Sequence, residues 1–161
     1  MHTVDRIVIR AHLDRVFQAA REIEAWPRIL SHYRWVRVLE QDANGGGDGS
    51  VVEMAAWRPF GPMGYPAWWV SQMTVDPAAH EIRYRHVRGI TRGMDVVWQL
   101  AAKSAAIQGA HVDATIVHTW SGPAWPLVGA WAADLVIGPV FIHGIASRTL
   151  AGIKRAVEGE A

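Results

Sequence analysis

The chain has 161 residues, a formal net charge of +1 and no cysteine, and it contains nine tryptophans against three phenylalanines. Its length fits one domain covering residues 1–161, while the absence of cysteine excludes disulfides, thiolate metal sites and cysteine nucleophiles and agrees with a cytoplasmic location. The low net charge excludes a general electrostatic attraction to nucleic acid, and the tryptophans indicate either a wide concave interior or a core that happens to use this residue.

The first predicted elements are a strand and two short helices. Residues 2–10 alternate between apolar and charged side chains, which is typical of a strand. Apolar residues at helical spacing predict a helix over residues 14–22. A second short helix is predicted over residues 23–30, where Pro27 is tolerated in the first turn.

Six further strands follow in succession. They are predicted over residues 33–40, 50–57, 67–75, 81–87, 94–102 and 111–120. A glycine-rich run at 43–49 predicts a hairpin loop, and strands joined by such short turns must pair antiparallel. Two proline-rich apolar segments, 58–66 and 121–126, are predicted as loops that either close over a ligand or cover an edge of the core.

The end of the chain is predicted to be helical to about residue 158. Its long apolar stretch, near residues 125–145, is interrupted by Asp134, Pro139 and His143, so we expect it to be buried rather than to span a membrane. An apolar stripe between residues 143 and 157 gives this helix a face that can cover one side of the sheet. The element order predicts an α+β fold.

Three segments of the sequence resemble the polyketide cyclase/dehydrase branch of the START-related SRPBCC superfamily. They are residues 23–33 followed by 36–40, the Trp68-Trp69-Val70-Ser71 block with its Asp76-Pro77 turn, and residues 145–154. The resemblance implies a helix-grip fold, in which a seven-stranded antiparallel sheet wraps around a long C-terminal helix and encloses a cavity for a hydrophobic small molecule. Members include aromatase/cyclases, quinone-binding proteins, lipid carriers and plant hormone receptors, so the fold leaves the function open.

The resemblance also implies aldol cyclisation and dehydration of a poly-β-ketone, which requires a donor to an enolate and a proton shuttle. It indicates a cavity tyrosine at Tyr33, which either donates to a carbonyl or forms part of the wall with its hydroxyl at the surface. His118 lies on a mostly apolar strand face and is a candidate general acid or base; the alternative is a histidine satisfied within the core. His143 is a third candidate catalytic residue if the C-terminal helix turns it toward the cavity rather than into packing.

The candidate ligand contacts are mostly aromatic, because flat indoles suit stacking against polycyclic rings. They are Trp35, Trp57, Phe60, Tyr65, Trp69, Met73, Trp98, Ile116, Trp125 and Phe141. Met73 stands where the family favours arginine, and its lack of charge favours binding without catalysis. Arg37, Arg83 or Arg85 either replaces that charge or is solvated.

Two functions therefore remain open at this point. The first is an aromatase/cyclase-like enzyme whose polyketide substrate is presented by an acyl carrier protein, and the alternative is a non-catalytic carrier of a lipid, quinone or polyketide. We expect no cofactor and no metal, since the histidines show neither H-E-x-x-H nor H-x-H spacing. We also expect a monomer or homodimer without stable membrane insertion.

Overall fold

The structure is a computed structural model that describes residues 1–41, 49–60, 63–103, 110–122 and 142–159, without the side chains of 58–60 and 63–65. Its strands are β1 (His2–Ile9), β2 (Tyr33–Gln41), β3 (Ser50–Phe60), β4 (Met63–Asp76), β5 (Glu81–Gly89), β6 (Asp95–Ala102) and β7 (Val112–Thr119). Its helices are α1 (Leu13–Arg21), the 3-10 turn η1 (Ile23–Ala25), α2 (Trp26–Ile29) and α4 (His143–Glu158). None of these helices is both long enough and apolar enough to cross a membrane.

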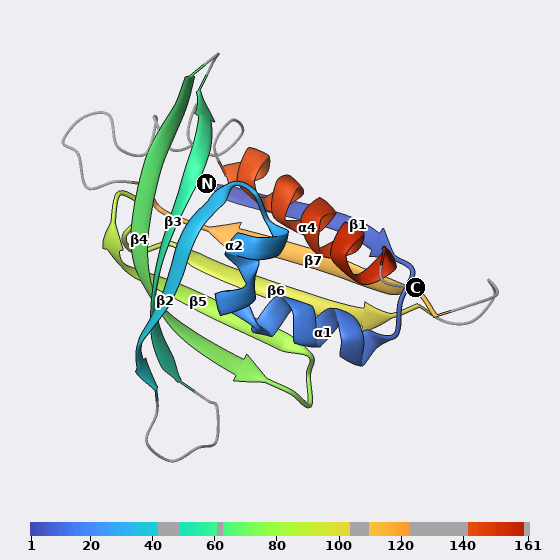
Figure 1. Ribbon diagram of the computed structural model, residues 1–161. Coiled ribbons are helices and arrows are strands. Elements are labelled where there is room, and N and C mark those ends of the chain that lie inside the picture. Colours follow the sequence, from blue (N-terminus) through green and yellow to red (C-terminus); the bar gives the residue numbers. More distant parts are fainter. Residues whose placement is uncertain (42–48, 61–62, 104–109, 123–141, 160–161) are drawn as a thin grey trace.

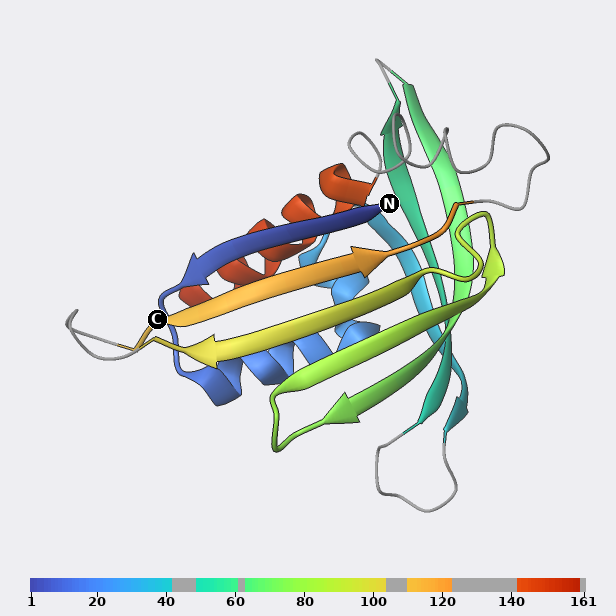
Figure 2. The same ribbon diagram turned by 180° about the vertical axis from the view of Figure 1, so that it is seen from behind.

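The strands form one curved antiparallel sheet in the order β1-β7-β6-β5-β4-β3-β2. The helices all lie on one side of it, and α4 packs against β1 and α1 (Figure 1). From behind, the sheet stands in front of the helices, with β2, β3 and β4 crossing steeply over the end of the other strands (Figure 2). The predicted helix-grip arrangement is confirmed.

The apolar stripe of α4 explains how the helix closes the sheet. Ala146, Leu150, Ile153 and Val157 recur every three or four residues, and each is at most 4% exposed. Residues at this spacing lie on one face of a helix. The predicted stripe is therefore confirmed for these four residues, whereas His143, at its start, is exposed. A kink expected at Gly138-Pro139, because proline lacks the backbone donor, lies outside the described residues.

The segment predicted as a loop over residues 58–66 is instead a hairpin, so that prediction is wrong. Strand β3 continues to Phe60 and β4 begins at Met63, and these two residues pair with one another. Strand β2 pairs with β3 only as far as Ala56, so the rest of β3 is an edge of the sheet. Proline is tolerated at such an edge because no backbone N–H is needed there for a hydrogen bond to a neighbouring strand.

A bulge near the start of β2 decides which side chains enter the interior. Tyr33 pairs with Ala56, but Trp35 pairs with Ala55, so Arg34 is an extra residue in the ladder. An inserted residue moves the following side chains to the opposite face of a sheet. Tyr33 and Trp35, two positions apart and both predicted to line the cavity, therefore lie on opposite faces of the sheet.

Candidate ligand cavity

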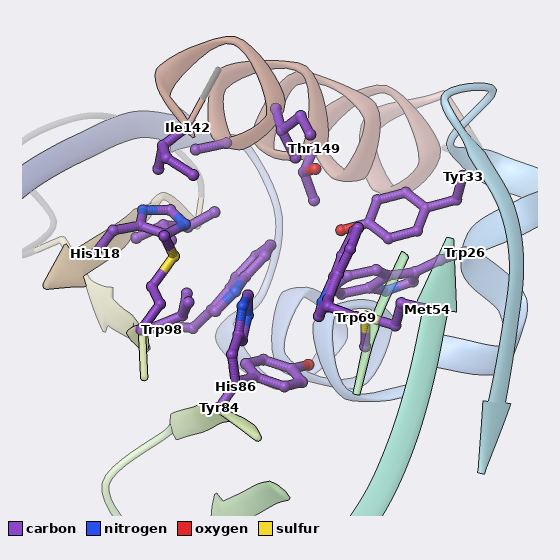
Figure 3. A pocket seen from close by; sticks show the side chains of 15 residues that line it. Trp26, Tyr33, Met54, Trp69, Tyr84, His86, Trp98, His118, Ile142 and Thr149 are labelled. Atoms are coloured by element: carbon purple, nitrogen blue, oxygen red, sulfur yellow. The ribbon is translucent and has the colours of Figure 1, made fainter. Parts of the chain in front are cut away.

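A cavity of about 60 Å³ lies between the concave face of the sheet and α4 (Figure 3). Apolar and aromatic side chains dominate its wall. The lining residues are Trp26, Tyr33, Met54, Trp69, Tyr84, His86, Met94, Val96, Trp98, Ile116, His118, Ile142, Ile145, Ala146 and Thr149. Ligand sites for drug-sized molecules usually measure roughly 300–1,000 Å³, so a bulky ligand fits here only when side chains move.

One wall of the cavity is a chain of aromatic rings. The Trp26 ring lies 5.1 Å from the Tyr33 ring and 5.7 Å from the Trp98 ring, and the Tyr33 ring lies 6.2 Å from the Trp69 ring. Trp26 is held by a hydrogen bond of 3.1 Å from its indole nitrogen to the Ala19 carbonyl. Edge and tilted contacts of this kind fix ring orientation, so the wall presents a preformed aromatic surface.

Tyr33, His118, Ile116, Trp69 and Trp98 all reach the cavity, although they come from four different strands. The structure therefore brings together two of the three predicted catalytic residues with three of the predicted contacts. Tyr33 faces inward just before the β2 bulge, and Ile116 and His118 face inward together because alternate residues of β7 share a face. The ligand-binding and catalytic roles of these five remain predictions.

His86 is a cavity residue that the sequence analysis missed. Its Nδ1 lies 2.6 Å from Oγ1 of Thr91, a residue only 1% exposed, and its ring stacks on Trp69 at 5.9 Å and 20°. The hydrogen bond and the stacking orient the imidazole, so that one edge of the ring faces the cavity. The hydroxyl of Thr91 comes from the turn between β5 and β6, which no strand pattern predicts.

Tyr84 is the second missed residue and lies two positions before His86. It is 5% exposed, and burial together with the nearby Tyr33 raises the pKa of its hydroxyl well above the usual value. A signal for both residues exists, because Arg83 and Arg85 alternate with them along β5. Where every second residue of a strand is charged, the residues between them are expected to point inward.

Thr149 brings a hydroxyl from α4 to the cavity, and His32 holds it. Thr149 Oγ1 lies 3.0 Å from Nε2 of His32, and both residues are buried. Burial, followed by the charges of Arg148 and Arg155, lowers the pKa of His32 to about 4. The imidazole is therefore neutral at pH 7 and can pair with a hydroxyl without adding charge to the core.

Trp35, Trp57 and Met73 do not line the cavity, which corrects their predicted place in its wall. Trp35 lies on the outer face after the bulge, under the Arg37 guanidinium, and Trp57 is 43% exposed. Met73 points inward and is buried, but it packs in the core beyond the cavity.

His143 also lies outside the cavity, contrary to the prediction. Its side chain is 63% exposed and its Nδ1 bonds to Oδ1 of Asp5 on β1. Burial raises the pKa of Asp5, and the hydrogen bond and charge of His143 offset part of that rise. His143 begins α4 one residue after Ile142, so the helix turns it toward β1 while Ile142 faces the cavity.

The three arginines considered as replacement charges are all on the outside. Arg37 stacks over Trp35, Arg83 pairs with Glu81, and Arg85 pairs with Asp95. Since they are exposed on the convex face of the sheet, none can act in the cavity. Among the described cavity residues the polar side-chain groups are hydroxyls, imidazoles and indole N–H groups, without a carboxylate, lysine or arginine.

Four predicted contacts cannot be placed. The side chains of Phe60 and Tyr65 are not described, and Trp125 and Phe141 lie in the stretch 123–141, which is outside the described residues. Over the part of the chain that is described, no three His, Asp or Glu side chains gather as a metal site. The chemistry available in the described cavity is therefore hydrogen bonding and proton transfer next to aromatic surface.

Comparison with known proteins identifies relatives of the chain in sequence and in fold. The chain is 32% identical over 98 residues to a protein of Streptomyces halstedii described as "Putative polyketide cyclase", covering 60% of this chain and 84% of that protein. The fold matches a START superfamily protein of Mycobacterium smegmatis (TM-score 0.74, 10% identity, 99% of both chains). It also matches the Zhui aromatase/cyclase of Streptomyces sp. R1128 (TM-score 0.63, 17% identity, 97% of this chain and 95% of that one).

These structural matches are too low in identity to show more than the fold. The family model, in contrast, covers residues 9–137, which is most of the chain, and is described as polyketide cyclase/dehydrase and lipid transport. It spans the strands that carry Tyr33, Trp69, His86 and His118. The chain belongs to the polyketide cyclase/dehydrase and lipid transport family.

Proposed function

We propose that the protein is a polyketide cyclase-like enzyme that binds an oxygen-rich, hydrophobic chain or aromatic ring system in this cavity and promotes aldol closure and dehydration. The observation that carries the proposal is the spacing of polar groups around the aromatic wall. His118 lies at one side of the cavity, Tyr33 at the other, and Tyr84, His86 and Thr149 between them (Figure 3). A ligand with oxygens along its whole length matches this spacing better than a ligand with one polar head.

The proposed chemistry assigns one role to each of two groups. His118 removes a proton from a carbon beside a carbonyl, and the enolate carbon then forms a bond to a second carbonyl carbon of the same chain. Tyr33 donates a hydrogen bond to the developing oxyanion, where a fixed donor in a dry site has its greatest effect. His118 returns the proton to the new alkoxide oxygen, and loss of this hydroxyl with a proton from the adjacent carbon, as water, forms the double bond of the closed ring. Supply of the chain by an acyl carrier protein, the monomeric or dimeric state and a cytoplasmic location stay predictions from the sequence.

The test is the product profile of a minimal polyketide synthase with and without the purified protein. We expect the protein to shift the products toward one cyclised, dehydrated aromatic compound. Tyr33→Phe and His118→Ala should lose most of that shift, while Trp68→Phe, which changes an exposed residue of the outer face, should keep it. An unchanged profile with the folded wild-type protein contradicts the enzymatic proposal.

A second candidate is a carrier without catalysis, and one observation favours it. The described cavity residues include no charged side chain that could stabilise an enolate. Native mass spectrometry of freshly purified protein separates the candidates. A carrier retains a bound lipid, quinone or polyketide and leaves the synthase products unchanged, whereas the enzyme changes them.

A further inference from the structure

The most unusual polar group in the cavity is the hydroxyl of Tyr84. The residue is 5% exposed and lines the cavity, yet its Oη has no hydrogen-bond partner among the described residues. A buried hydroxyl without a partner costs free energy, and native proteins rarely leave one unsatisfied. Because Tyr84 lines the cavity, a molecule bound there can supply the partner.

The residues that pair with Tyr84 in the sheet offer its hydroxyl no strong acceptor. Tyr84 is paired with Met73 on β4 and with Val96 on β6. The valine side chain has no hydrogen-bond acceptor, and the methionine sulfur is a weaker acceptor than an oxygen. Figure 3 shows the ring below His86, with its hydroxyl turned toward the Trp69 and Met54 side of the cavity. The donor thus points along the aromatic wall rather than into the core.

We infer that Tyr84 is a specificity-determining residue that donates its phenolic proton to a carbonyl or enol oxygen of the bound ligand. The inference rests on the proposed function, since it assumes that the cavity holds a ligand. In the empty cavity, water can satisfy the hydroxyl, and a ligand that displaces this water loses affinity unless it brings an acceptor. Tyr84 therefore selects for an oxygen-bearing ring system over a hydrocarbon of the same shape.

The experiment compares two bicyclic probes that differ by one carbonyl oxygen, 1-tetralone and tetralin. Their affinities are measured by calorimetric or NMR titration for the wild type, Tyr84→Phe and Ser71→Ala. Ser71 is the matched control, because its hydroxyl is also buried without a partner among the described residues but does not line the cavity. One hydrogen bond corresponds to roughly a 2- to 12-fold change in affinity.

We expect Tyr84→Phe to weaken 1-tetralone binding by about 5- to 10-fold, within the range of one hydrogen bond, and to leave tetralin binding within a factor of two. Ser71→Ala should change neither affinity. Equal effects of Tyr84→Phe on both probes, or no effect on either, would overturn the inference while leaving the proposed cavity function intact. If neither probe binds the wild-type protein, the cavity function and this inference fail together.

A second measurement does not depend on how well Tyr84→Phe folds. The infrared carbonyl band of ¹³C-labelled 1-tetralone bound to wild-type protein and to Tyr33→Phe should lie at the frequency of a hydrogen-bonded ketone. A band at the frequency found in hexane would overturn the inference. Where Tyr84→Phe is folded, its band should move toward the hexane value.

Discussion

Trp68 and Trp69 are neighbours in the sequence, but they belong to opposite faces of the sheet. Trp69 is 5% exposed and lines the cavity with Trp26 and Trp98, and we refer to these three as the inner tryptophans. Trp68 is 50% exposed, and it and Trp35 pair with Ala55 from the two strands on either side of β3. We refer to Trp35, Trp57 and Trp68 as the outer tryptophans. The contrast shows that a tryptophan-rich composition does not by itself indicate a cavity. Each indole must first be assigned to the inner or the outer face of the sheet.

The largest expected effect is on stability and separates the two faces directly. Trp69→Ala should lower the free energy of unfolding by about 3–5 kcal/mol, because it removes a buried ring from the aromatic wall. Trp68→Ala should cost less than about 1 kcal/mol, as for most exposed residues. Urea denaturation of both variants measures the difference, and similar losses would contradict the assignment of faces.

The sequence predicted this architecture better than it predicted the cavity. Strand alternation and the stripe on α4 are local patterns, so the sheet, the helix cover and the place of Trp69, Trp98, Ile116 and His118 followed from them. The bulge at Arg34 has no local signature and reversed the face of Trp35. The hydrogen bond of His86 with Thr91 depends on the turn between β5 and β6, and that of His143 with Asp5 depends on where α4 starts. Neither can be predicted from the alternation of residues along a strand.

The second prediction contrasts a buried histidine with an exposed one. The pKa of His32 is about 4 in the folded protein against an ordinary value of 6.5, so the unfolded state binds more protons between these values. Stability should therefore fall as the pH drops from about 6.5 to about 4, by on the order of 3 kcal/mol, and this contribution should level off below that.

The measurement is the pH dependence of urea unfolding for the wild type, His32→Gln and His2→Gln. His32→Gln should remove this part of the slope, and His2→Gln, which changes an exposed residue of β1, should keep it. A His32→Gln protein with the wild-type slope would show that His32 is not neutral within the fold.

A third prediction concerns the close approach of β5 to the two neighbouring tryptophans. Gly89 has φ +96°, and a Cβ there would lie 2.5 Å from the Trp68 carbonyl oxygen and 3.1 Å from Cβ of Trp69. Gly93 also has a positive φ, +86°, but has open space around it. Gly89→Ala should therefore be less stable than Gly93→Ala by about 2 kcal/mol, since only the first adds a steric clash to backbone strain.

Thermal or urea unfolding of the two alanine variants measures this effect. Because both positions have a positive φ, the conformational cost of alanine is nearly the same in the two variants and cancels in the comparison. Equal stabilities would indicate that β4 and β5 separate easily at this point. In that case Trp69 would not be held rigidly in the cavity wall.

The central claim is that the inner tryptophans, and not the outer ones, surround the bound ligand. Fluorine NMR of protein labelled with 5-fluorotryptophan tests it most directly, with resonances assigned through single Trp→Phe variants. On addition of 1-tetralone we predict shifts for Trp26, Trp69 and Trp98 and unchanged resonances for Trp35, Trp57 and Trp68. Shifts confined to the outer tryptophans would contradict the account and move the ligand site to the convex face of the sheet.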